Sequence, residues 1–271
     1  MTDTDARFRE FDLLERATSS AEVTVRDDQY EFPWLLDAVH SCKKHGGRFR
    51  LVDSGKSDTV SLCWLAEAGA DIYTSDEARP EPGDVIPVRL SARKSGAHTF
   101  YYIGAETAED SNHALFLPDI AELGRTGVDL HLSNREKPRD AGLLVDLARA
   151  CSSGHGRLVY YHYGRLAEFL ENVALAGGWT HWASGDENPD KDAFLLEDIL
   201  RACRKTGAGL ILHLNPGWPL SLMRKVFEAG AFLLFDGQPS GWASSLSALE
   251  SEAARRRPDF RAFYLHRDFL P

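Results

Sequence analysis

Short segments with alternating apolar and polar residues recur along the chain and are separated by longer amphipathic segments. The short ones have the length and period of half-buried strands. The longer ones have a helical period and often end at a glycine, as at Ala68-Gly69 and Ala229-Gly230. Regular alternation of strand and helix predicts parallel strands joined by crossover helices. Strands are expected over 22–27, 48–53, 71–76, 99–104, 128–133, 158–163, 180–184, 210–215, 232–236 and 262–266.

Several predicted strands carry one apolar and one polar face. In 128–133, Leu130 and Leu132 alternate with Asp129, His131 and Ser133. Because successive strand side chains point to opposite faces, the leucines are expected under a covering layer of helices. The polar residues would then line a barrel lumen or a concave surface.

One helical segment occurs three times in the chain. Each copy has an apolar residue, an acidic residue two positions later and a cysteine five positions beyond that. The last two copies stand 52 positions apart, which indicates a repeating unit of about that length. The copies begin at Leu35, Leu144 and Leu196 and end at Cys42, Cys151 and Cys203.

These patterns predict an α/β fold, specifically a (β/α)8 TIM-barrel-like single domain built from βαβα repeats of about 52 residues. The 271 residues suit such a barrel. Residues 1–20 are expected to be an N-terminal extension, with the βα units over 21–271. Ten strand signals exceed eight places, so the first or the last would lie outside the ring. An open α/β solenoid is the main alternative and a doubly wound sheet another.

Composition and charge narrow the class of protein. The net charge of −10 argues against nucleic-acid binding, which needs a basic surface. The first residues, Met1-Thr2-Asp3-Thr4-Asp5, do not have the pattern of a signal peptide, and no apolar run approaches the roughly 20 residues that span a bilayer. The cysteines are widely spaced, without a C-x-x-C pair, and are expected to be buried and reduced. A cytoplasmic protein without a membrane partner is therefore predicted.

Candidate chemistry lies where strands are expected to end, because barrel enzymes place their active sites there. Imidazole and carboxylate groups at such positions suit general acid–base catalysis, with or without a divalent metal. The competing interpretation is that the carboxylates only cap the following helices. The candidate catalytic residues are His131, His162, His213 and Asp236, with Asp53 and Asp76 as the nearest carboxylates.

No motif specifies a reaction. Gly55-Lys56-Ser57 matches the end of a phosphate-binding P-loop, but Arg50 stands where its first glycine is required. The aromatic run Tyr160-Tyr161-His162-Tyr163 is expected mainly to fill the core.

The leading hypothesis is an enzyme, a hydrolase or lyase, that acts on a small polar molecule. The alternative is a non-catalytic repeat protein that binds a protein or glycan partner on a concave polar face. The cofactor is unknown beyond the divalent metal considered above, and a homo-oligomer is compatible with the sequence.

Overall fold

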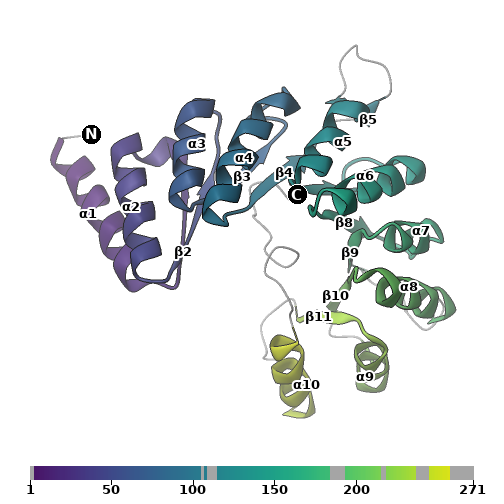
Figure 1. Ribbon diagram of the computed structural model, residues 1–271. Coiled ribbons are helices and arrows are strands. Elements are labelled where there is room, and N and C mark those ends of the chain that lie inside the picture. Colours follow the sequence, from purple (N-terminus) through teal and green to yellow (C-terminus); the bar gives the residue numbers. More distant parts are fainter. Residues whose placement is uncertain are drawn as a thin grey trace. The chain divides into compact units, whose positions relative to one another are not determined.

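The computed structural model describes residues 3–104, 107–108, 115–183, 193–214, 218–235 and 244–256. Within these ranges, strands and helices alternate as the sequence predicts (Figure 1). The main strands are β1 (Glu22–Arg26), β2 (Arg48–Val52), β3 (Asp71–Ser75), β4 (Thr99–Ile103), β7 (Asp129–Ser133), β8 (Leu158–Tyr163), β9 (Trp179–Ala183), β10 (Leu210–Leu214) and β11 (Phe232–Phe235).

Helices follow most of these strands. They are α1 (Asp3–Ser19), α2 (Phe32–Lys44), α3 (Thr59–Ala68), α4 (Val85–Ser95), α5 (Leu117–Thr126), α6 (Ala141–Ser153), α7 (Phe169–Leu175), α8 (Ala193–Thr206), α9 (Leu220–Ala229) and α10 (Ser244–Arg255). Two short 3-10 helices, Asp27–Gln29 and Pro82–Asp84, and two short strands, β5 (Thr107–Ala108) and β6 (Leu115–Phe116), were not predicted.

The predicted α/β barrel-like fold class is confirmed. Among the described residues, nine strands form one sheet in the sequential order β1-β2-β3-β4-β7-β8-β9-β10-β11. The pairings of β1 with β2, β2 with β3, β3 with β4, β8 with β9, β9 with β10 and β10 with β11 are all parallel. Nine of the ten predicted strands are present, and the tenth, 262–266, lies outside the described residues.

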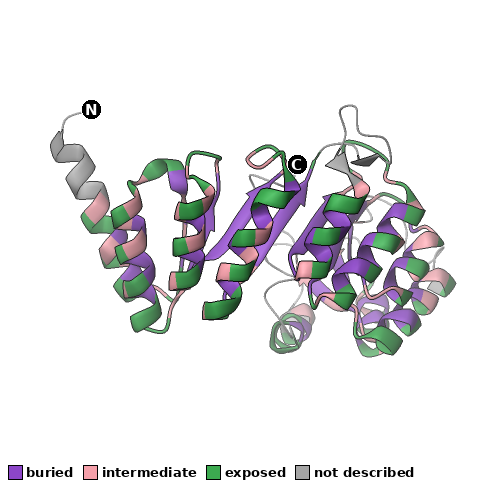
Figure 2. Cartoon of the chain, turned by 45° about the horizontal axis from the view of Figure 1, so that its top comes forward, coloured by how far each residue is buried: buried purple, intermediate pink, exposed green. Residues whose placement is uncertain are grey.

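The chain divides into two compact units, Met1–Leu130 and His131–Pro271. In the first unit, the core forms between the strands and α1 to α4, with Leu35, Leu51 and Ile72 fully buried. Residues 10–19 of the expected N-terminal extension belong to this unit as part of α1, whose Leu13 and Ala17 are buried in the same core. Figure 2 shows that the helices turn buried stripes toward the strands and exposed faces away from them.

The repeated segment forms α2, α6 and α8, and its cysteines are buried in all three helices. This confirms that Cys42, Cys151 and Cys203 are core residues. The four cysteines are all free thiols. Among the helices of the described residues, none has the length and apolar character needed to cross a membrane.

Candidate functional site

The candidate residues divide between the two units. Asp53 and Asp76 follow β2 and β3 in the first unit, whereas His131, His162 and His213 lie on β7, β8 and β10 in the second. Asp236 lies outside the described residues.

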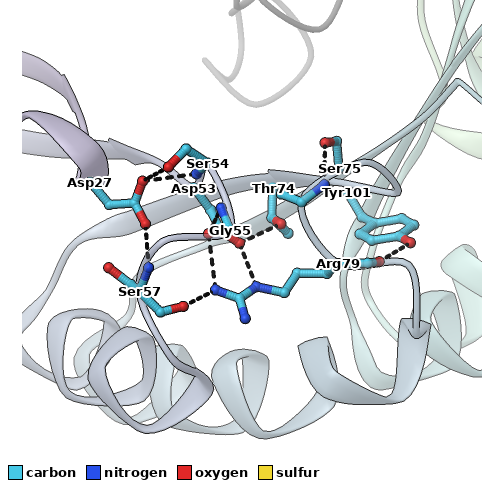
Figure 3. Close-up of polar contacts among 10 residues, drawn as sticks. Asp27, Asp53, Ser54, Gly55, Ser57, Thr74, Ser75, Arg79 and Tyr101 are labelled. Atoms are coloured by element: carbon cyan, nitrogen blue, oxygen red, sulfur yellow. Dashed lines mark hydrogen bonds and ion pairs between the residues drawn. The ribbon is translucent and has the colours of Figure 1, made fainter.

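Asp53 belongs to a buried ion pair. Its carboxylate accepts hydrogen bonds from Arg79 Nε at 2.8 Å and Nη2 at 3.0 Å, from Thr74 Oγ1 at 2.7 Å and from the Gly55 amide at 2.9 Å (Figure 3). The Asp53 side chain is fully buried and that of Arg79 is 12% exposed. Arg79 also donates to the Ser57 carbonyl, so the pair ties the loop after β2 to the loop after β3. These contacts give Asp53 a structural role in the first unit.

The Arg79 loop is held from a second side. The Tyr101 hydroxyl donates to the Arg79 carbonyl at 2.8 Å. Burial raises the pKa of Tyr101, so its hydroxyl stays a donor. The hydrogen bond with Asp53 raises the pKa of Arg79, whose guanidinium is charged at any ordinary pH.

The P-loop-like segment is already bound by a carboxylate of this chain. Asp27 accepts hydrogen bonds from the Ser54 amide at 2.8 Å, the Ser54 hydroxyl at 2.5 Å and the Ser57 amide at 2.9 Å (Figure 3). Burial by itself raises the pKa of Asp27, but these hydrogen bonds outweigh it and the pKa is lowered. Asp27 thus binds two of the loop amides, as an anionic ligand would.

Helix capping accounts for only some of the acidic residues after strands. Asp58, five residues beyond Asp53, caps α3 by accepting from the Ser61 amide at 2.6 Å. Asp140 caps α6 in the same way, at 2.8 Å from the Leu143 amide. Asp76 is partly exposed, and its amide donates to the Tyr102 carbonyl at 3.1 Å.

In the second unit, strand register aligns side chains into rows on one face of the sheet. Tyr160 and His162 contact Phe169 of α7, so Tyr161 and Tyr163 point away from that helix. The pairings place Tyr163 beside Ala183, Ala183 beside His213, and His213 beside Leu234. These four residues, here called the upper row, are all partly exposed.

One step deeper lies the buried row, formed by Tyr161, His181 and Ile211. Register pairs Tyr161 with His181 and His181 with Ile211. Their exposed fractions are 2%, 1% and 0%. Tyr161 and Ile211 of this row belong to the same apolar cluster as Val159 and Trp179, and Tyr163 and Leu234 of the upper row pack against that cluster.

His213 of the upper row is hydrogen-bonded to His181 of the buried row. Nδ1 of His181 lies 2.9 Å from Nε2 of His213, and the ring centroids are 5.2 Å apart. When the two nitrogens are 2.9 Å apart, the ring centroids can be this far apart only if both nitrogens lie close to the line that joins the centroids. The two nitrogens therefore point at each other. The geometry suits an N–H···N hydrogen bond with one shared proton. Two nitrogens that ligate one metal would converge at an angle instead.

His131 supports this row from the neighbouring strand. Its Nδ1 lies 2.8 Å from the Tyr161 hydroxyl, and the ring of Tyr161 lies 4.6 Å from that of His181. Burial lowers the pKa of His131 from 6.5 to about 3. His131 is therefore neutral at physiological pH, which suits a hydrogen-bonding partner of Tyr161 better than a proton donor to substrate.

His162 lies on the opposite face of β8. Its Nε2 lies 2.7 Å from the Arg165 carbonyl and therefore donates, which leaves Nδ1 to accept from the Asn134 amide nitrogen at 3.3 Å. Burial lowers the pKa of His162, although the hydrogen bond to Arg165 opposes the shift. Of the three predicted histidines, only His213 belongs to the upper row. The hydrogen bonds and ring contacts given above join His131 to Tyr161, and His162 to Asn134, Arg165 and Phe169, but join neither histidine to His213.

Some residues of this arrangement were not among the sequence-based candidates. His181 and Arg79 were not singled out, and Tyr161 was expected mainly to fill the core. The alternation of faces in β9 was an available signal for His181, which shares its face with Trp179 and lies between two strands that carry histidines. Within the described residues, no group of three His, Cys, Asp or Glu side chains is arranged to hold a metal.

Comparison with known proteins does not identify a family. No family model and no curated protein sequence matches the chain. Several solved structures align over much of it with low scores. The first is 3-dehydroquinate dehydratase from Aquifex aeolicus, 13% identical over 76% of this chain and 95% of that chain, with a TM-score of 0.33.

The second is a putative fructose-1,6-biphosphate aldolase from Coccidioides immitis, 17% identical over 80% of this chain and 79% of that chain, with a TM-score of 0.34. The third is deoxyribose phosphate aldolase from Aeropyrum pernix, 11% identical over 93% of this chain and all of that chain, with a TM-score of 0.31. Similarity at this level specifies neither a reaction nor a substrate.

Proposed function

We propose that the second unit is an enzyme of the lyase or hydrolase type that moves a proton on a small polar substrate at the upper row. His213 is the proposed general acid–base residue. The observation that carries this proposal is the hydrogen bond between partly exposed His213 and fully buried His181. A general base must be reachable by substrate and held in one orientation, and this pair meets both requirements.

His181 is the proposed positioning residue. If Nε2–H of His213 donates to Nδ1 of His181, the lone pair of His213 lies on Nδ1, where it can accept a proton. Protonated His213 then keeps its Nε2–H bond to His181 while it returns the proton from Nδ1. The proton therefore moves between substrate and one ring nitrogen without breaking the hydrogen bond that orients the ring.

Tyr161 and His131 hold the positioning residue in place. The ring of Tyr161 packs against His181, and its hydroxyl is hydrogen-bonded to His131. Because His131 is neutral, it brings no charge into the core beside this row. In this proposal, His131 is a positioning residue, and the roles predicted from sequence for His162, Asp53, Asp76 and Asp236 are not needed for proton transfer.

The test is a turnover screen of the full chain against small hydroxy acids, keto acids, esters and phosphoesters. A substrate found in this way should lose at least about 100-fold in kcat with His213→Ala, the usual size of an acid–base contribution. His155→Asn is the matched control, because His155 is exposed in the loop before β8 and asparagine tolerates its positive φ.

Turnover that survives in His213→Ala would contradict the proposal. Binding without turnover of any screened compound would instead favour the non-catalytic alternative. His181→Gln should lower kcat more than it raises KM and should alter the acid limb of the pH–rate profile, which a purely structural role would not do.

A further inference from the structure

We infer that the ligand of the upper row carries a carboxylate or phosphoryl group and that Arg135 binds it. This inference rests on the proposed function for the location of the site. It adds the chemical class of the ligand and a residue that recognises it.

Arg135 stands at the carboxyl end of β7, beside the upper row. Its guanidinium carbon lies 5.6 Å from the centroid of the Tyr163 ring, over that ring. Its amide donates to the Ser133 hydroxyl at 3.0 Å, which fixes the backbone from which the side chain extends. A guanidinium in this position keeps N–H groups available for a planar, two-pronged contact with an oxyanion.

Arg135 differs from the arginines on the helices. Arg125, Arg149 and Arg201 each pair with an acidic residue three positions earlier. Among the residues that the structure describes, no carboxylate lies within ion-pair distance of Arg135, and Tyr163 is its side-chain contact. Nearby Arg139 is used structurally, because its Nε donates to the Ser133 carbonyl at 2.9 Å. Arg135 is thus an exposed cation without an acidic partner in the described part of the chain.

Strand register relates Arg135 to the proposed acid–base residue. Tyr163 and His213 flank Ala183 in the upper row. With neighbouring strands about 4.8 Å apart, their Cα atoms are separated by roughly 10 Å. Only the methyl group of Ala183 lies between the two rings within the row. A ligand of a few heavy atoms can therefore contact the guanidinium at one end and His213 at the other.

The overall charge favours a local cation at such a site. A chain with net charge −10 offers a small anion no general attraction, so a nearby positive group would strengthen its binding. An arginine beside an aromatic ring meets this need and also orients the anion relative to His213.

The test titrates the full chain with inorganic phosphate and, separately, with acetate, monitored by calorimetry and by NMR of the histidine rings. Arg135→Gln should raise the Kd of the anion that binds by about tenfold or more, as expected for a charge-assisted hydrogen-bonded contact. Arg149→Gln is the matched control, because Arg149 is exposed and lies on α6; it should leave the Kd unchanged. Tighter binding of phosphate identifies a phosphoryl group, and tighter binding of acetate identifies a carboxylate.

The inference is overturned if neither anion binds, if Arg135→Gln and Arg149→Gln behave alike, or if binding leaves the His213 resonances unmoved. His213→Ala separates this inference from the proposed function. If anion binding persists in His213→Ala while no turnover is found for any variant, the anion site stands and the catalytic proposal fails.

Discussion

Replacing Arg79 by methionine should destabilise the first unit strongly. The substitution removes the guanidinium hydrogen bonds at 2.8 and 3.0 Å from a carboxylate whose side chain is fully buried. Asp53 would keep only the neutral donors Thr74 and Gly55. Removing one partner of a buried ion pair typically costs about 3–5 kcal/mol, because the remaining charge stays desolvated.

Urea denaturation of wild type and Arg79→Met measures this cost, and hydrogen exchange of peptides from β2 and β3 assigns it to the first unit. The double variant Arg79→Met with Asp53→Asn should recover part of the loss, since it removes the unpaired charge. Arg125→Met is the control, because its pair with Glu122 is half exposed on both sides and should matter by less than about 1 kcal/mol.

An Arg79→Met loss below about 1 kcal/mol, or equal to that of Arg125→Met, would refute this reasoning. A double variant whose loss of unfolding free energy equals the sum of the two single losses would also refute it. Either result would mean that water or another group solvates Asp53 when the arginine is gone.

Two further predictions concern buried titrating groups. The pKa of His131 falls from 6.5 to about 3 on folding, so its contribution to stability is complete above pH 6.5 and is lost as the pH falls toward 3. The free energy of unfolding should therefore fall by up to about 1.4 kcal/mol per pH unit in this range. Urea denaturation between pH 7 and 4 should show a smaller fall for His131→Gln than for wild type. Equal slopes for the two proteins would exclude His131 as the cause. Burial raises the pKa of Cys203 to about 12 and also raises the pKa of Cys42. Iodoacetamide at pH 8 should therefore label the partly exposed Cys63 first in the native protein. Equal labelling of Cys203 would contradict this prediction and would show that the core around α8 opens readily.

The linear pattern of residues was sufficient to predict the nine strands of the main sheet and the presence of helices between them. Strand β8 was predicted over its full observed range, and β7 and β10 were predicted to within one residue. These elements can be recognised in the sequence because apolar residues recur with period two along each strand and with period 3.6 along the buried face of each helix. The cysteines of α2, α6 and α8 were recognised as core residues for the same reason, since their spacing from the preceding leucines follows the helical period.

Contacts between distant segments required the tertiary structure. Asp53 and Arg79 are separated by 26 positions, and His181 and His213 by 32. Nothing in the local period distinguishes a buried, arginine-bound Asp53 from an exposed capping aspartate. Likewise, β9 alone shows a histidine among aromatic residues, and only its register against β8 and β10 places His181 against both Tyr161 and His213.

The physical reason is that local periodicity reports which face of an element is buried, whereas a site depends on how neighbouring elements are aligned. A shift of one residue in strand register would turn His181 to the helix-covered face and separate it from His213. The sequence by itself therefore determined the α/β class, the strands and their polar faces. The packing of parallel strands decided that His213 stands beside His181, that Asp53 is bound by Arg79, and that Arg135 lies over Tyr163.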